Sequence, residues 1–191
     1  MGLALGVSRS VAKTAFLALL AALIYGALDW LVDLPPAALA FVSEEVRAIP
    51  SGAQVTFECD FQIAARHLRR RSYEIAFPIV TRGVAPLAED VNVRVEGASV
   101  PVTQTPQGFL FDAPVTPGCE FEMSVRYRLP APDHKAVYVS TTARLWPEPP
   151  RVARFVLPQD ATSNYHSSGE TVVEFHDFRP REDWRIKWQS D

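Results

Sequence analysis

The sequence has no excess of positive charge, which is what a nucleic-acid partner would require. Its 191 residues carry 19 Lys and Arg against 22 Asp and Glu, for a formal net charge of −3. Proteins bind duplex nucleic acid through many Lys and Arg side chains on one face, and a chain of near-neutral charge shows no such excess of positive side chains. We therefore expect no nucleic-acid partner.

Motifs for nucleophilic, redox and metal chemistry are also absent from the sequence. It contains no Gly-x-Ser-x-Gly and no Cys-x-x-Cys, and its four histidines show no His-x-His or His-x-x-x-His spacing. The serines around His166 are typical of a polar loop before a strand. We expect a non-enzymatic protein without a cofactor or metal. Paired carboxylates that cleave glycosides leave no local signature, so a carbohydrate-active site stays open as an alternative.

One long hydrophobic run stands at the N-terminus. Residues 14–28 carry no charge, Arg9 and Lys13 precede them, and Asp29 follows. As a helix that continues through Val32, this run is about 28 Å long, close to the roughly 30 Å of a bilayer core. Positive charges on the N-terminal side favour a cytoplasmic N-terminus. The sequence thus predicts a membrane-spanning signal-anchor over residues 1–34, with the rest of the chain outside the cytoplasm.

Processing of this segment has an alternative. Residues 38–40 read Ala-Leu-Ala, a small-x-small site at which a signal peptide would be cleaved near Ala40 to release a secreted protein. Without cleavage, residues 35–52 would form a stalk or linker, with a short amphipathic helix over residues 37–47. Both readings leave residues 53–191 as one extracytoplasmic domain.

Alternation of apolar and polar residues dominates that domain. Residues 55–63 and 119–129 alternate without interruption, as half-buried strands do. Shorter alternating runs and turn residues follow at intervals of about ten residues, which predicts eight or nine strands. Such a pattern is typical of an all-β, antiparallel β-sandwich. We expect two packed sheets in an immunoglobulin-like arrangement, with a small closed barrel as the alternative.

The chain has only two cysteines, Cys59 and Cys119, and each falls on the apolar phase of a long strand. Because export allows oxidation, we expect a disulfide between the two sheets. On the chain-entropy model such a bond contributes about 4 kcal/mol. Two buried free thiols are the alternative, since cysteine often serves as a small hydrophobic residue.

Two further features are candidate binding sites. Arg66, Arg69, Arg70 and Arg71 form a basic run between two strands, which suits an anionic partner or, alternatively, a solvated turn. Trp184 and Trp188 share one face of the last predicted strand. They form an aromatic stripe that could stack on sugars or dock a partner, or else belong to the core.

These features lead to one functional expectation. A membrane anchor followed by a compact sandwich without catalytic motifs is typical of a non-enzymatic protein-interaction or assembly module. The alternative is an exported carbohydrate-binding or carbohydrate-active envelope protein.

Overall fold

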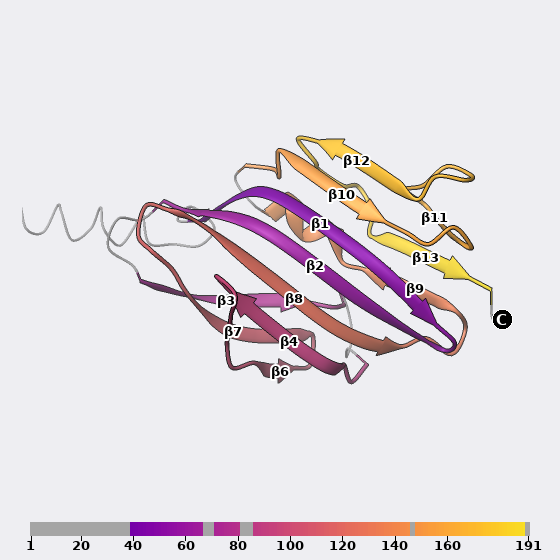
Figure 1. The fold of residues 1–191 in the computed structure, drawn as a ribbon, viewed down its shortest axis with the longest axis horizontal. Helices are drawn as coiled ribbons and strands as arrows, with labels where there is room; N and C mark the ends of the chain where they lie inside the picture. Colours follow the sequence, from indigo (N-terminus) through magenta and orange to yellow (C-terminus); the bar gives the residue numbers. More distant parts are fainter. Residues whose placement is uncertain (1–38, 67–70, 81–85, 146–147, 190–191) are drawn as a thin grey trace, which may run out of the picture.

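The computed structural model describes residues 39–66, 71–80, 86–145 and 148–189 (Figure 1). Strands make up nearly all of its regular structure, and one short 3-10 helix, η1 (Ser140–Leu145), is the exception in these ranges. Within the same ranges, no helix has the length and apolar character needed to cross a bilayer. The expected membrane-spanning segment, residues 1–34, lies outside the described residues.

The largest element is a seven-stranded sheet with the order β12-β10-β1-β2-β8-β4-β5. Strands β1, β2 and β8 are its long central members, and β1 pairs with β10 in parallel while the other neighbours are antiparallel. The bounds in chain order are β1 (Leu39–Ser51), β2 (Gln54–Ala65), β4 (Glu89–Val95), β5 (Ala98–Ser99), β8 (Glu120–Pro130), β10 (Val152–Val156) and β12 (Val172–His176).

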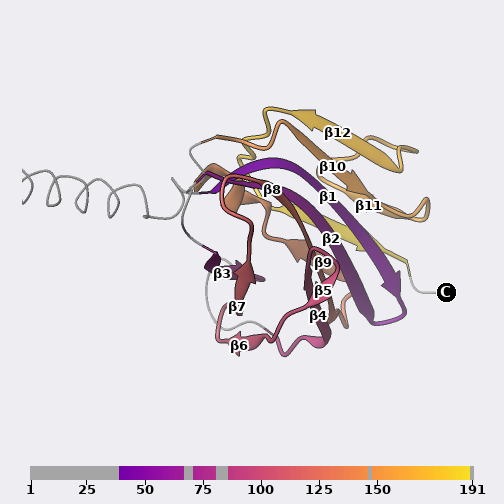
Figure 2. The ribbon, with the colours of Figure 1, turned by 60° about the vertical axis from the view of Figure 1, so that its left-hand side comes forward.

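Two three-stranded sheets form the second layer. One has the order β3-β7-β6 and the other β11-β13-β9. Their bounds are β3 (Ser72–Pro78), β6 (Thr103–Thr105), β7 (Gly108–Pro114), β9 (Lys135–Tyr138), β11 (Ala161–Ser163) and β13 (Trp184–Trp188). In Figure 2 the β3-β7-β6 sheet lies below the curved long strands.

Aromatic contacts show that both small sheets pack on the same face of the large sheet. Tyr127 of β8 meets Phe77 of β3, with ring centroids 5.8 Å apart. Phe57 of β2 meets Tyr138 of β9 at 5.9 Å. The fold is therefore a β-sandwich in which the second layer is split into two separate sheets.

This arrangement confirms the all-β sandwich and the two long alternating strands. Apolar residues of β2 and β8 are buried on the inner face, while their polar neighbours face outward. The immunoglobulin-like pairing of two sheets differs from what is observed, because the second layer is split and β1 and β10 run parallel. Strand β9 ends at Tyr138, and the 3-10 helix η1 follows it.

Strand β1 corrects the predicted stalk and helix. Residues 39–51 form a 13-residue strand that pairs with β2 on one side and with β10 on the other. Val46 and Ala48 are fully buried on its inner face. The folded unit therefore includes residues 39–51 as well as those after residue 53, because this strand supplies the hydrogen-bond partners of two neighbours.

Candidate functional site

The two cysteines do not meet, which corrects the predicted disulfide. Both are free thiols: Cys59 is buried and Cys119 is exposed. Cys59 lies opposite Val125 in the β2–β8 ladder, and Cys119 is six positions before Val125, where its carbonyl accepts the Ala65 N–H at 2.9 Å. Six residues along a strand span about 20 Å, whereas a disulfide needs Cα atoms within about 7 Å. The register therefore keeps the two thiols apart.

The basic run is only partly described. Arg66 forms an ion pair with Glu148, and both side chains are largely exposed. Arg71 is exposed at the start of β3, where its carbonyl accepts the Val115 N–H at 2.9 Å. Arg69 and Arg70 lie outside the described residues. An anionic partner for this run stays a prediction.

The tryptophans belong to the core and do not form an exposed stripe. Trp184 is 0% exposed and Trp188 is 5% exposed. The Trp184 ring packs against the Phe155 ring, with centroids 5.0 Å apart. Trp188 Nε1 donates a hydrogen bond to the Gly52 carbonyl at 3.0 Å. The side chains that alternate with them, Arg185 and Lys187, face solvent. Neither tryptophan therefore offers an exposed ring on which a sugar could stack.

Ser163 and His166 come together in a structural turn. Ser163 Oγ lies 2.7 Å from His166 Nδ1, and it also accepts the backbone N–H groups of Tyr165 and His166. His166 Nε2 is 3.0 Å from the Phe155 carbonyl, so Nε2 carries the proton and Nδ1 accepts from the hydroxyl. Burial lowers the pKa of His166. The hydroxyl thus closes a turn and is not presented to a substrate.

Glu44 is the one buried carboxyl group in the described core. It lies on the inner face of β1 and is 5% exposed. The Tyr138 hydroxyl donates to Glu44 Oε1 at 2.7 Å. Burial raises the pKa of Glu44 to about 7, and the hydrogen bond from Tyr138 opposes this rise. No cationic side chain of the described residues pairs with it.

A register shift in β1 accounts for the position of Glu44. Phe41 pairs with Ile63, but Ser43 pairs with Gln62, so Val42 is an extra residue in the ladder. The carbonyl of Val42 instead accepts the Arg151 N–H at 3.0 Å. Such a bulge re-aims the side chains on either side of it. As a result, both Phe41 and Glu44 face the inner layer.

A cavity of about 300 Å³ adjoins Glu44. It lies where the two small sheets fail to meet, between β3 on one side and Tyr138 with η1 on the other, against β1, β2 and β8. Its lining is apolar apart from Glu44, Tyr138 and Thr142. The apolar walls include Phe41, Phe61, Phe77, Ile63, Ile75 and Val139. This cavity, named here the seam cavity, places one carboxyl group at the edge of an apolar space.

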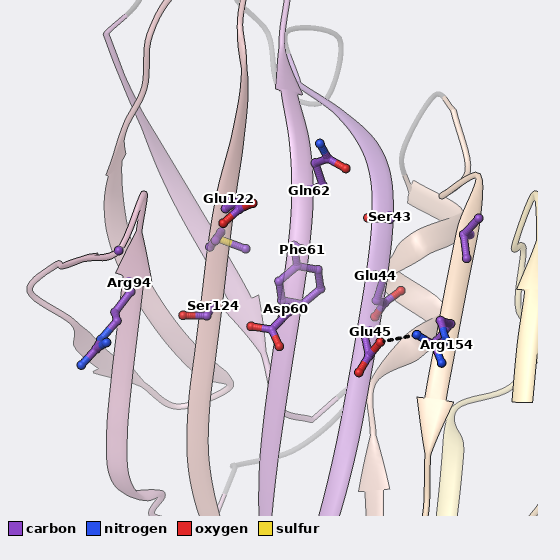
Figure 3. A pocket seen from close by; sticks show the side chains of 13 residues that line it. Ser43, Glu44, Glu45, Asp60, Phe61, Gln62, Arg94, Glu122, Ser124 and Arg154 are labelled. Carbon is purple, nitrogen blue, oxygen red and sulfur yellow. Dashed lines mark hydrogen bonds and ion pairs between the residues drawn. The ribbon is translucent and has the colours of Figure 1, made fainter. Parts of the chain in front are cut away.

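The outer face of the large sheet carries a second, polar hollow of about 650 Å³ (Figure 3). We call it the outer hollow. Carboxylates of Glu45, Asp60 and Glu122 lie in it, with Arg154 at one side and Arg94 at the other. Arg154 pairs with Glu45 at 2.9 Å. Its other lining side chains include Ser43, Gln62 and Ser124.

Asp60 shows that negative charge is in excess at the centre of the outer hollow. Desolvation raises the pKa of Asp60, and the nearby carboxylates of Glu45 and Glu58 raise it further. The positive charge of Arg47 lowers the pKa of Asp60, but by less than burial and the two carboxylates raise it. A cation that entered the hollow would relieve this repulsion.

Neither Glu44 nor the outer hollow was singled out from the sequence. The adjacent acids Glu44 and Glu45 follow the N-terminal hydrophobic run in the sequence, where they resemble a charged flank. The signal that could have found them is the alternation of Glu44, Val46 and Ala48, which places a carboxyl group on an apolar phase. Across the described ranges, no group of three or more His, Cys, Asp or Glu side chains is arranged to hold a metal ion.

Comparisons with known proteins inform the fold alone. No protein-family model matches the sequence, and no curated protein matches it. Among solved structures, leukotriene A4 hydrolase from Saccharomyces cerevisiae is similar with a TM-score of 0.50 and 10% identity, over 78% of this chain and 29% of that one. An M1 zinc metallopeptidase from Deinococcus radiodurans is similar with a TM-score of 0.43 and 12% identity, over 78% of this chain and 42% of that one. The chain thus spans less than half the length of either protein. At 10% identity, the similarity to the hydrolase concerns the fold and says nothing about activity.

Proposed function

We propose that this chain is a membrane-tethered, extracytoplasmic interaction module that binds a protein partner through the outer face of its seven-stranded sheet, without catalysis. The observation that carries the proposal is the outer hollow, where the carboxylates of Glu45, Asp60 and Glu122 gather on an otherwise solvent-facing sheet. The partner would present Lys or Arg side chains to these carboxylates.

The size of the outer face supports a protein partner. Its seven strands range from 2 to 13 residues, and at about 3.3 Å of length and about 4.8 Å of strand spacing per residue they give a face of about 900 Å². A standard protein interface buries about 800 Å² on each partner. The outer face is therefore large enough for a stable interface, with the outer hollow as its acidic centre.

Charge complementarity gives the face its specificity. Arg154 neutralises Glu45 in part, and it also reaches Glu174 at 3.5 Å. Asp60 has no hydrogen bond or ion pair with any described side chain, and it lies between two other acids. A basic side chain of the partner at Asp60 would replace repulsion by attraction, which steers association and fixes register.

The position of β1 supports tethering by an uncleaved N-terminal segment. Leu39 and Ala40 are each 4% exposed, and they pair with Ala65 and Ala64. Cleavage after Ala40 would remove two buried, hydrogen-bonded residues from the central strand of the sandwich. An intact anchor would leave β1 whole and hold the sandwich close to the outer surface of the membrane. The aromatic stripe no longer supports the carbohydrate-binding alternative, because both of its tryptophans are buried. The carbohydrate-active alternative, which rests on paired acids, stays a prediction.

Affinity capture of the full chain from native membranes after chemical crosslinking tests the proposal. We expect the wild type to retain a protein partner that Asp60→Lys loses by tenfold or more, because like charges across an interface are costly. Lys187→Glu, on the exposed face of β13, is the matched charge-reversal control and should retain the partner. Equal recovery with Asp60→Lys and the wild type, or recovery of nothing but the chain itself, would overturn the proposal.

A further inference from the structure

We propose that the seam cavity is a binding site for a small primary amine with an apolar body, whose ammonium group pairs with the Glu44 carboxylate. The site goes beyond the interaction surface proposed above. Glu44, Phe61 and Met123 border both the seam cavity and the outer hollow. The two proposals depend on different carboxylates, Glu44 here and Asp60 above, so they can fail independently.

The shape of the seam cavity sets the size of the ligand. Its volume is about 300 Å³, and a buried apolar cavity of about 150 Å³ is enough to hold benzene. A phenyl ring with a short alkyl chain, or an alkyl chain alone, therefore fits the space. Phe41, Ile75 and Thr142 are half-buried members of its lining, so they form its mouth.

The polar end of the ligand is set by Glu44. Charged groups are almost never fully buried unless they are paired. Glu44 receives one hydrogen bond, from Tyr138, and no described side chain gives it a positive charge. The missing partner is a cation that can enter an apolar space, which describes the ammonium group of an amphipathic amine.

Other classes of ligand fit less well. A carboxylic acid would place a second acid beside Glu44 and add repulsion. An alcohol of the same shape could donate a hydrogen bond but would leave the charge of Glu44 unpaired. Since Tyr138 already donates to Oε1, the carboxyl group acts as an acceptor, and an ammonium is the strongest donor for it.

Binding should depend on pH through Glu44 alone. The titratable groups around it are Cys59 on β2, Tyr138 on β9 and Tyr165, with Tyr127 of β8 beyond Cys59. Burial raises the pKa of all four, which keeps them neutral near pH 7. Burial also raises the pKa of Glu44, to about 7. The ionised fraction of Glu44 then rises about tenfold between pH 6 and pH 8, and amine affinity should rise with it.

The test uses the full chain in phosphatidylcholine nanodiscs, with 4-phenylbutylamine as the ligand and 4-phenylbutan-1-ol as its neutral analogue. Methyl NMR signals of Ile63 and Ile75, which line the seam cavity and not the outer hollow, report occupancy at the site itself. We expect saturable shifts with the amine at pH 8, about tenfold weaker binding at pH 6, and at least tenfold weaker binding of the alcohol at pH 8.

Three variants locate the site. Glu44→Gln should weaken amine binding by tenfold or more and remove its pH dependence, while Glu45→Gln, on the opposite face of β1, should bind as the wild type does. Asp60→Lys should also bind the amine normally, whatever its effect on the protein partner. The proposal is overturned if the cavity methyl signals do not saturate, if amine and alcohol bind equally, or if Glu44→Gln binds unchanged. Should Glu44→Gln not fold, the amine-to-alcohol comparison on the wild type decides.

Discussion

Replacing Glu44 by Gln should change how the stability of the protein depends on pH. Burial raises the pKa of Glu44 in the folded chain from its ordinary value of 4.5 to about 7. Since each pKa unit corresponds to about 1.36 kcal/mol, this difference amounts to about 3 kcal/mol. The stabilisation is fully present below about pH 4.5, where the group is protonated in both states. It is lost as pH rises toward 7, because the unfolded chain ionises first.

The assay is urea unfolding of the wild type, Glu44→Gln and Glu45→Gln, followed by tryptophan fluorescence at pH 5 and pH 8. Between these values the wild type should lose about 2.5 kcal/mol more of its unfolding free energy than Glu44→Gln does. Gln can still accept the hydrogen bond from Tyr138, so packing is retained. Glu45→Gln should keep the loss that comes from Glu44, because Glu44 is unchanged in it.

Comparison between variants is needed because other groups titrate in the same range. His166 has a lowered pKa and stabilises the fold as pH rises, whereas Asp60 has a raised pKa and acts in the opposite direction. Both contributions are common to the wild type and Glu44→Gln and cancel in that difference, whereas Glu45→Gln also removes one of the carboxylates that raise the pKa of Asp60. Parallel pH profiles for the wild type and Glu44→Gln would refute the reasoning, since they would mean that Glu44 has the same pKa in the folded and unfolded chain.

Two further predictions concern the cysteines and the tryptophans. In the native protein, without reductant, a thiol reagent should label Cys119 at once and Cys59 only after unfolding in urea, as intact mass would show. A requirement for reduction before either cysteine reacts would contradict the register of β2 and β8. Trp184→Ala should lower the free energy of unfolding by about 3–5 kcal/mol, whereas Lys187→Ala on the other face of β13 should change it by at most about 0.5 kcal/mol. Similar losses for both variants would contradict the burial of Trp184.

The sequence predicted best where one physical signal acted alone. Strands β2 and β8 alternate cleanly because one face of each packs on aromatic residues and the other meets water. Strand β1 was missed because its outer and inner faces both carry an acid, at Glu45 and Glu44, next to a hydrophobic run. That pair resembles a charged flank, although each acid serves a different face of the same strand.

Pairing and burial could not be predicted from alternation. Both cysteines fall on the apolar phase of an alternating run in the sequence, but Cys119 lies just before β8 and is exposed, and only the register between β2 and β8 shows that the two thiols lie far apart. Trp184 and Trp188 share a face in any strand, and the pattern does not say whether that face meets solvent or the core. The seam cavity depends on the split of the second layer into two sheets, which follows from contacts distant in sequence.

The cost of Glu44 is itself an argument for a role. At neutral pH its burial opposes folding by about 3 kcal/mol, a large share of the 5–15 kcal/mol by which a typical domain is stable. A glutamine would keep the hydrogen bond with Tyr138 and avoid most of this cost. Exceptions to apolar patterning are found chiefly at functional sites. Glu44 breaks the pattern of β1 at a bulge and beside a cavity, so a ligand that supplies the missing positive charge explains its presence better than the fold alone does.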